Sequence, residues 1–408
     1  MEWNKIDQIL RDTAYVRTGG TEAELKCAHY LQEQCAQMGL TAAIEPFEVD
    51  MATIQEAKLF IDGREITCKG YLNAGSAEVE AELLYLPNPD PWALKQSKGK
   101  IVLVDGYLRY WLYQDLLENG AVGFISYDGN ANYPDRDIDQ RELRAEVHKG
   151  NKLPGVNINA KDAIEIVRGN GKTAKIVLKQ EEYKGESRNV VMELPGEVDE
   201  WIVLTAHYDS TSLSTGAWDN MSGSIGLLGI AEKFAREPHR YGLRFVWCGS
   251  EERGLLGSKA YCAAHEEELK KVVLNVNLDM IGCIMGKFIA VCTTEEKLVH
   301  YIQYLALELG FPVDAKDGVY SSDSTPFADK GVPALSFARI APSNTAVIHN
   351  RYDTLDVMKA EQTALDIDFL NVFVGRMANA AHCPVGRTIP EKMKEKLDVY
   401  LLRKREGK

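Results

Sequence analysis

The chain has 408 residues, a length that predicts two or three domains and excludes a single small binding module. Its 60 acidic against 47 basic residues give a net charge of −13, and 45% hydrophobic with 26% charged residues is the composition of a globular protein, not of a disordered or membrane-embedded one. A protein that binds nucleic acid needs a basic face for the phosphate backbone, so nucleic acid is not expected as a partner.

The first residues are polar and charged, and no stretch approaches the ~20 apolar residues of a membrane-spanning helix. The eight cysteines form no Cys-x-x-Cys pair and are scattered through apolar segments. Such a distribution favours reduced, buried thiols over a disulfide framework. We therefore expect a cytoplasmic protein without a membrane partner.

The residue pattern of the chain changes near residue 52, from helical segments to short β-type segments. Residues 1–40 are expected to form two helices, the second over Thr21–Met38, and a strand is expected over Thr41–Val49. From about residue 52 to 185, short β-type runs alternate with Gly, Pro and Asn. This pattern predicts a separate β-rich domain.

After Arg188, apolar strands alternate with amphipathic helices, beginning with a strand at Trp201–Ala206 and a helix at Ser222–Arg236. Near-continuous apolar strands between helices predict an α/β fold with a mixed, mostly parallel sheet flanked by helices. We expect residues 1–51 and 186–386 to form one discontinuous domain, residues 52–185 to be an insertion, and residues 387–408 to be a charged C-terminal tail.

Polar side chains follow each apolar strand of this second half, where a parallel sheet places its ligands. They are His207, Asp209, Asp219, Glu251, Glu252, Asp279 and His349. Each alone is readily explained as a helix cap, a turn residue or a surface pair. Together they predict one cleft at the carboxyl edge of the sheet.

Several carboxylates in one cleft raise one another's pKa, and bound cations remove that cost. Imidazole and carboxylate ligands without thiolate favour zinc, with cobalt or manganese possible. If one carboxylate bridges two ions, five residues supply two three-ligand sites, each with an open position. The pattern therefore predicts two metal ions.

One carboxylate beyond the five ligands is left for proton transfer. Glu251, next to a ligand, is suited to take a proton from a metal-bridging water and pass it to a leaving amine. Asp209, two residues after His207, is suited to accept a hydrogen bond from that imidazole. Serine-based catalysis is not supported, because the chain has no Gly-x-Ser-x-Gly motif.

The segments that carry these residues resemble the di-zinc exopeptidases of the leucyl aminopeptidase and aminopeptidase Y type. The similar segments are Ala206-His-Tyr-Asp-Ser, Trp218-Asp-Asn-Met-Ser-Gly, Gly249-Ser-Glu-Glu-Arg-Gly, Asn277-Leu-Asp-Met-Ile-Gly and His349-Asn-Arg-Tyr-Asp-Thr. The resemblance implies that His207 and Asp279 hold one zinc and that Glu252 and His349 hold the other. It further implies that Asp219 bridges the ions and Glu251 is the general base.

The middle segment resembles a protease-associated domain, an insertion that some members of this family carry. The similarity lies in Ser97-Lys-Gly-Lys-Ile-Val-Leu-Val-Asp, Leu116-Leu-Glu-Asn-Gly-Ala-Val-Gly-Phe-Ile and Leu153-Pro-Gly-Val. In the family, a tyrosine shortly before a Ser-Asp pair helps to polarise the scissile carbonyl. Tyr320-Ser-Ser-Asp323 is similar, which makes Tyr320 the candidate oxyanion donor.

The expected function is that of a zinc-dependent metallo-aminopeptidase, a hydrolase acting on peptides with a free N-terminus, and a homo-oligomer is possible. A carboxypeptidase or N-acyl amidohydrolase on the same scaffold stays open, since the ligands do not say which end of a peptide enters. Arg339, after the strand Ala334–Ala338, is the candidate carboxylate clamp of that alternative. A receptor-like binding protein and a glutaminyl cyclase are the remaining alternatives.

Overall fold

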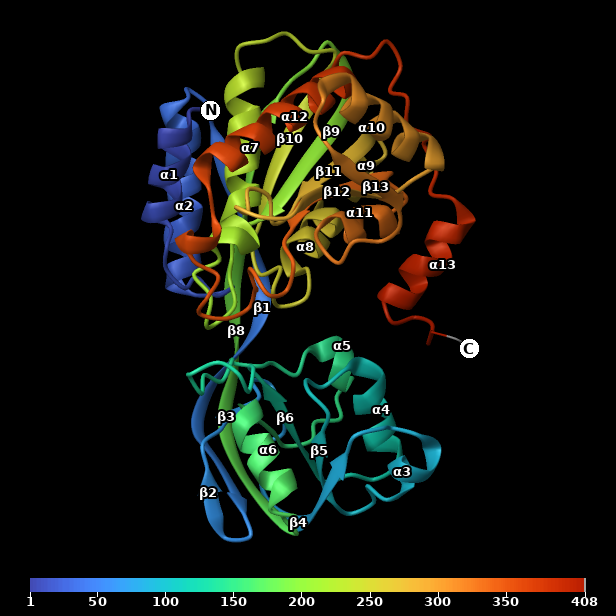
Figure 1. Cartoon of the computed structure of the whole chain (residues 1–408). Helices are drawn as coiled ribbons and strands as arrows, with labels where there is room; N and C mark the ends of the chain where they lie inside the picture. The colour runs from blue at the N-terminus through green and yellow to red at the C-terminus, as the bar shows by residue number, and fades with distance from the viewer. Residues whose placement is uncertain (407–408) are drawn as a thin grey trace. The chain divides into compact units, whose positions relative to one another are not determined.

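The computed structural model describes residues 1–406 and divides into two compact units (Figure 1). The first unit comprises Met1–Val49 and Glu186–Lys408, and the second comprises Asp50–Gly185. Two long strands, β1 (Ala42–Ile61) and β8 (Thr173–Leu194), pair with each other and carry the chain from one unit to the other. The strand expected over Thr41–Val49 is therefore the first part of a longer one.

The first unit is built around a mixed, mostly parallel sheet of order β13-β12-β14-β11-β9-β10-β8. Strands β14, β11, β9 and β10 are parallel to their neighbours in this run, whereas β12 is antiparallel to β14 and β8 is antiparallel to β10. The new strands are β9 (Val198–His207), β10 (Tyr241–Cys248), β11 (Val272–Leu278), β12 (Lys287–Thr293), β13 (Val313–Asp317) and β14 (Ala334–Ile340). All residues of β10 and β11 are buried, as expected for central strands covered on both faces, so the predicted fold class is confirmed.

Helices cover both faces of this sheet (Figure 1). They are α1 (Trp3–Asp12), α2 (Glu22–Gln37), η1 (Ala217–Met221), α7 (Ser222–Phe234), α8 (Leu256–Ala264), α9 (Glu266–Leu269), α10 (Glu296–Leu309), α11 (Ser324–Asp329), η2 (Leu355–Val357), α12 (Ala360–Ala378) and α13 (Glu391–Tyr400). Helices α1, α2, α7, α10 and α12 bury their apolar sides in one large core with one face of the sheet. Helices α8 and α9 contribute Tyr261, Cys262 and Leu269 to a smaller core on the other face.

The C-terminal segment 387–408, expected as a charged tail, contains helix α13. Met393 and Leu397 are one helical turn apart on the same side of α13, and both are buried. They pack in a cluster with Ala328, Ala334 and Ile389. The charges of residues 387–406 therefore lie around an apolar stripe that packs against the rest of the first unit.

The second unit has its own buried core and a sheet in which β4, β5, β6 and β7 are parallel. Its elements are β2 (Arg64–Ile66), β3 (Lys69–Gly70), β4 (Ala77–Leu86), α3 (Pro91–Lys95), β5 (Ile101–Val104), α4 (Tyr110–Glu118), β6 (Gly123–Asp128), α5 (Ala145–His148), β7 (Gly155–Asn159) and α6 (Ala160–Arg168). The sequence reading of a β-rich unit missed these helices. Each has at most nine residues, too few for a clear helical period.

Within residues 1–406, no helix is both long enough and apolar enough to cross a membrane.

Candidate metal centre

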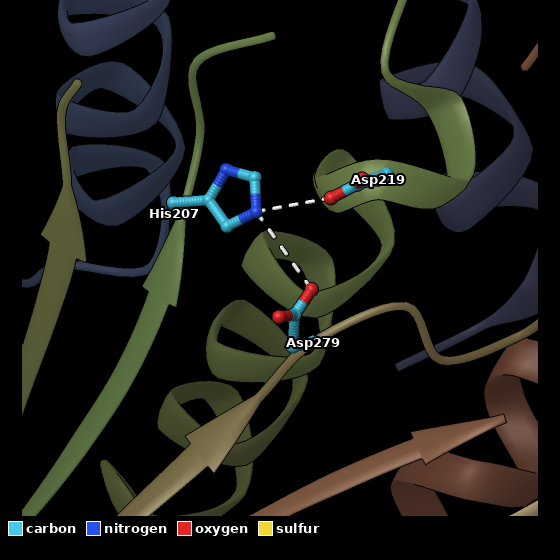
Figure 2. Close-up of side chains that lie close together, drawn as sticks. All are labelled: His207, Asp219 and Asp279. Carbon is cyan, nitrogen blue, oxygen red and sulfur yellow. Dashed lines mark hydrogen bonds and ion pairs between the residues drawn. The ribbon is translucent and has the colours of Figure 1, made fainter. Parts of the chain in front are cut away.

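His207 is the last residue of β9, and Asp279 directly follows the neighbouring strand β11. Because β9 and β11 are parallel, their carboxyl ends meet at one edge of the sheet. The His207 Nε2 atom lies 3.1 Å from Asp219 Oδ1 and 3.7 Å from Asp279 Oδ1 (Figure 2). Asp219 comes from η1, the turn before α7, and its peptide bond to Asn220 is cis.

A second cluster lies on the other side of Asp219. The Asp219 Oδ2 atom is 3.1 Å from His349 Nε2, and His349 Nε2 is 3.2 Å from Glu252 Oε2. Glu252 lies in the turn after β10, and His349 lies in a loop after β14 with a left-handed backbone, φ +61°. The two oxygens of Asp219 thus face two different imidazoles, which is the arrangement of a carboxylate shared by two sites.

The charges in this centre perturb its titrating groups strongly. Burial lowers the pKa of His349, but the carboxylates of Glu252 and Asp219 raise it by more, to about 12. Burial raises the pKa of Glu251 well above its ordinary value, and the neighbouring Glu252 adds to this shift although His207 opposes it. Four carboxylates and two imidazoles at one edge of the sheet carry an excess of negative charge, which favours bound cations.

Asp209 holds two parts of the centre together. Its carboxylate lies 3.4 Å from His207 Nδ1, on the side of the ring opposite Asp219. The same carboxylate accepts hydrogen bonds from the backbone amides of Glu251 at 3.0 Å and Glu252 at 3.3 Å. Asp209 therefore lies next to His207, as expected, and it also holds the backbone of the turn that carries Glu251 and Glu252.

Two further residues, which the sequence did not single out for a role, fix the backbone of Asp219. The buried carboxylate of Asp353 accepts hydrogen bonds from Trp218 N at 2.8 Å, Asp219 N at 3.1 Å and Ser214 Oγ at 3.1 Å. Asp353 lies four residues after His349, so it ties the loops of two candidate ligands together. In the sequence, only the four-residue spacing between His349 and Asp353 indicated that Asp353 lies near the site.

Asn220 provides the second connection. Its Nδ2 donates to Leu278 O at 2.9 Å, and its Oδ1 accepts from Met280 N at 3.0 Å. These partners are the residues on either side of Asp279. The side chain of Asn220 thereby sets the distance between Asp219 and Asp279, which no sequence pattern reveals.

Glu251 and Tyr320 complete the set of predicted site residues. Glu251 Oε2 lies 3.9 Å from His207 Nε2, beyond hydrogen-bond distance. Burial raises the pKa of Tyr320, and the nearby carboxylates of Asp279 and Asp219 raise it further. The phenol therefore stays protonated and can donate a hydrogen bond near the clusters.

The donor atoms suit divalent metal ions in two places. His207, Asp219 and Asp279 each offer one ligand atom, and these atoms lie within 4.8 Å of one another. Asp219, Glu252 and His349 form the second such group. Among the buried atoms of residues 1–406, Asp279 Oδ1 has no hydrogen-bond partner, as a ligand atom awaiting a cation would. Nitrogen and oxygen donors in groups of three fit zinc.

Arg339, the candidate carboxylate clamp, is committed elsewhere. Its Nε atom lies 2.9 Å from Asp366 Oδ2, and its Nη2 atom lies 2.5 Å from Asp366 Oδ1. Asp366 has no exposed side-chain area, and Arg339 has only 11%. The guanidinium also lies over the rings of Phe288 and Phe311. Arg339 of β14 is therefore paired with Asp366 of helix α12 in a largely buried ion pair.

The first unit is an α/β domain with two histidine and carboxylate clusters at the carboxyl edge of its sheet. Comparisons with known proteins place this arrangement among the peptidases. Residues 189–367 match the model described as peptidase family M28. The matched range contains every residue of the two clusters.

Individual relatives have modest sequence identity. Aminopeptidase YwaD of Bacillus subtilis is 27% identical over 401 residues, 93% of this chain and 85% of the relative. Aminopeptidase Y of Saccharomyces cerevisiae is 29% identical over 170 residues, 39% of this chain and 31% of the relative. The crystal structure of BSAP, a zinc aminopeptidase from Bacillus subtilis, matches with a TM-score of 0.76 at 25% identity, covering 95% of this chain and 98% of that one.

Proposed function

We propose that this protein is a di-zinc aminopeptidase that removes N-terminal residues from peptides. The observation that carries the proposal is the position of Asp219, whose two oxygens each lie 3.1 Å from a different imidazole. The relative in Bacillus subtilis is named an aminopeptidase, and the matching crystal structure is that of a zinc aminopeptidase. Both names support the same activity.

We assign His207 and Asp279 to one zinc, Glu252 and His349 to the other, and Asp219 to both. Cobalt or manganese could replace zinc on ligand type alone. When bound, zinc polarises the peptide carbonyl and makes a water molecule more acidic. The number of two ions rests on the two ligand groups that share Asp219.

The chain's own residues have distinct tasks in the reaction. Glu251, partly buried and next to His207, accepts a proton from the attacking water and delivers it to the leaving amine. Asp209 orients the His207 ring and the turn of Glu251 through the contacts given above. Tyr320 donates a hydrogen bond to the carbonyl oxygen as negative charge develops there.

The environment of Arg339 supports an aminopeptidase over a carboxypeptidase. A carboxypeptidase needs a cation that binds the terminal carboxylate of the substrate. Arg339 was the candidate for this task, and its guanidinium instead faces the buried carboxylate of Asp366. The excess of carboxylates in the centre is, in contrast, compatible with the free α-amine of a substrate.

A peptide panel tests the direction of cleavage. The panel holds one sequence with a free amine, the same sequence N-acetylated, and the same sequence C-terminally amidated. We expect acetylation to abolish turnover, because the free amine positions the first peptide bond. Amidation should change kcat/KM by less than about twofold, since no terminal carboxylate is read. Rapid cleavage of the acetylated peptide would favour the amidohydrolase, and dependence on a free carboxylate would favour the carboxypeptidase.

For the domains, we propose that residues 1–51 and 186–386 form the catalytic domain and that residues 52–185 form a protease-associated-like insertion without catalytic residues. Both candidate metal groups lie outside Asp50–Gly185, which supports this division. The possible homo-oligomer and the cytoplasmic location stay predictions.

A further inference from the structure

A buried glutamate on the N-terminal helix α2 lies behind the turn that carries the proposed base. Glu24 has no exposed area, and neither do Ser187 of β8 and Ser250 of the turn after β10. Ser250 directly precedes Glu251 and Glu252. These three side chains form one buried polar network outside the metal clusters.

Part of the environment of Glu24 is that of a helix cap. The hydroxyl of Thr21 accepts a hydrogen bond from Glu24 N, and Glu24 Oε2 accepts one from Gly20 N at 2.8 Å. A capping role uses this one oxygen. The other oxygen, Oε1, accepts a hydrogen bond from Ser187 Oγ at 2.6 Å, and Ser250 Oγ lies 3.4 Å from it.

The hydroxyls connect Glu24 to the catalytic turn in a definite order. Ser250 Oγ lies 2.8 Å from Ser187 Oγ, so Ser250 donates to Ser187 and Ser187 donates to Glu24. In its ionised form the carboxylate of Glu24 only accepts, and it then fixes the direction of both hydroxyl protons.

The turn at Ser250 is strained and tightly enclosed. Ser250 has φ +53°, a left-handed conformation that is uncommon for a residue other than glycine. A Cβ atom at Gly19 would lie 2.2 Å from Ser250 Oγ, and one at Gly249 would lie 2.6 Å from Glu24 Oε1. Contacts that hold this conformation therefore also decide where the next two side chains point.

We propose that Glu24 is a positioning residue that, through Ser187 and Ser250, fixes the turn from which Glu251 and Glu252 enter the metal centre. The turn is then held from two sides, by Asp209 through the backbone amides and by Glu24 through the Ser250 hydroxyl. This role rests on the proposed function, because it serves the base and the ligand assigned there.

The electrostatics of Glu24 agree with a role other than stability. Burial raises the pKa of Glu24 to about 7, and the charge of Asp209 contributes to the shift. Arg188 Nη1 lies 3.6 Å from Glu24 Oε2, and its charge opposes this shift. Even with these partners, a buried carboxylate is weak evidence for stability compared with an apolar side chain of similar size.

Glu24→Gln is the decisive variant. Glutamine satisfies a capping box, but Gly20 N and Ser187 Oγ donate to different oxygens of Glu24. The amide NH2 of glutamine replaces one of these oxygens, so one of the two donors loses its acceptor. We expect kcat or the zinc affinity to fall about 10–100-fold, as is typical for partners of metal-site residues, with KM changed less than about twofold. Glu22→Gln, an exposed position in the first turn of the same helix, is the matched control and should behave as wild type.

Coupling between variants separates positioning from capping. Ser250→Ala should reproduce the loss, and the Glu24→Gln/Ser250→Ala double variant should lose no more than the worse single variant, because both act through one network. Ser187→Ala, which leaves Glu24 in place, replaces Glu24→Gln if that variant does not fold. Wild-type kcat and zinc affinity in Glu24→Gln, or losses that multiply in the double variant, would overturn the proposal.

Zinc affinity, measured by competition with a chromogenic chelator, keeps this test separate from the proposed function. A wild-type protein that binds zinc but cleaves no peptide would refute the aminopeptidase. The effect of Glu24→Gln on zinc affinity would still decide whether Glu24 positions Glu252.

Discussion

Replacing Arg339 by methionine distinguishes a structural arginine from a substrate clamp. Methionine keeps much of the apolar volume but removes the guanidinium, leaving the Asp366 carboxylate buried. Its remaining donors are Gly282 N at 2.9 Å and Gln362 Nε2 at 3.0 Å. Removing one partner of a buried ion pair costs ~3–5 kcal/mol, because the other charge stays buried without compensation.

Two further variants, Asp366→Asn and the double variant, check the expected loss of stability. Asp366→Asn should cost less than Arg339→Met, since an amide keeps one acceptor oxygen and the arginine can still reach Gly286 O at 2.9 Å. The Arg339→Met/Asp366→Asn double variant should regain at least half of the loss, because no charge is then left buried.

Two measurements on the same preparations complete the experiment. Urea unfolding of the zinc-saturated variants gives the free energy of unfolding, and steady-state kinetics compare one peptide with a free and an amidated C-terminus. We expect stability to fall while the ratio of kcat/KM for the two peptides stays unchanged. The reasoning fails if Arg339→Met keeps its free energy of unfolding within about 1 kcal/mol of wild type, or loses activity only on the peptide with the free carboxylate.

Further predictions address the metals, the base, a pH-sensitive contact and the insertion. Mass spectrometry should find about two zinc ions per chain, lost together with activity on chelation, and a fully active protein with fewer would contradict the shared role of Asp219. Glu251→Gln should keep both ions and lower kcat by ~10²–10⁴, whereas Glu252→Gln should deplete one ion. If both variants bind as much zinc as wild type and Glu251→Gln keeps the wild-type kcat, these assignments are wrong. His265 lies 3.0 Å from a carboxylate oxygen of Glu45 and 3.1 Å from one of Glu268. Burial lowers the pKa of His265, but these carboxylates raise it by more. The stability that the charged ring provides is complete below its unfolded pKa near 6.5 and is lost as pH rises through the higher folded value. The free energy of unfolding of wild type should therefore exceed that of His265→Gln by more at pH 6 than at pH 9, and an equal difference at both values would refute the charged contact. Replacing residues 52–185 by a short Gly/Ser linker should leave zinc binding intact and change KM, peptide-length preference or assembly; loss of zinc would show that the proposed boundary is misplaced.

The sequence was most informative where hydrophobic runs are long. Strand Val272–Leu278 and helix α2 were predicted to within a residue. The strand is an apolar run interrupted only by Asn275 and Asn277, and Thr21 caps the helix. Strand β13 and helix α11 were missed, since Val313–Asp317 alternates charges with only a few apolar residues and Ser324–Asp329 is a short helix. Short elements of this kind form because tertiary packing selects them, not because their own pattern does.

For the candidate site, residue type and strand position brought all five proposed ligands to one edge of the sheet. Which side chains hold those ligands in place was not readable. Glu24 accepts a hydrogen bond from Ser187, which lies 163 residues later in the chain. Asp353 accepts one from Asp219, which lies 134 residues earlier. Local patterns carry no information about such pairings, because they depend on how the chain packs.

The paired strands β1 and β8 bear on the history of this gene. The chain leaves the first unit through one strand and re-enters through its partner, so the second unit interrupts the sheet between two adjacent strands. Gain or loss of such a segment leaves the order of the other strands unaltered, and every proposed metal ligand lies downstream of the re-entry point. An insertion or deletion at this place would leave the five proposed ligands and Glu251 on one unbroken stretch of coding sequence, whereas Glu24 and its partner Ser187 lie on opposite sides of it.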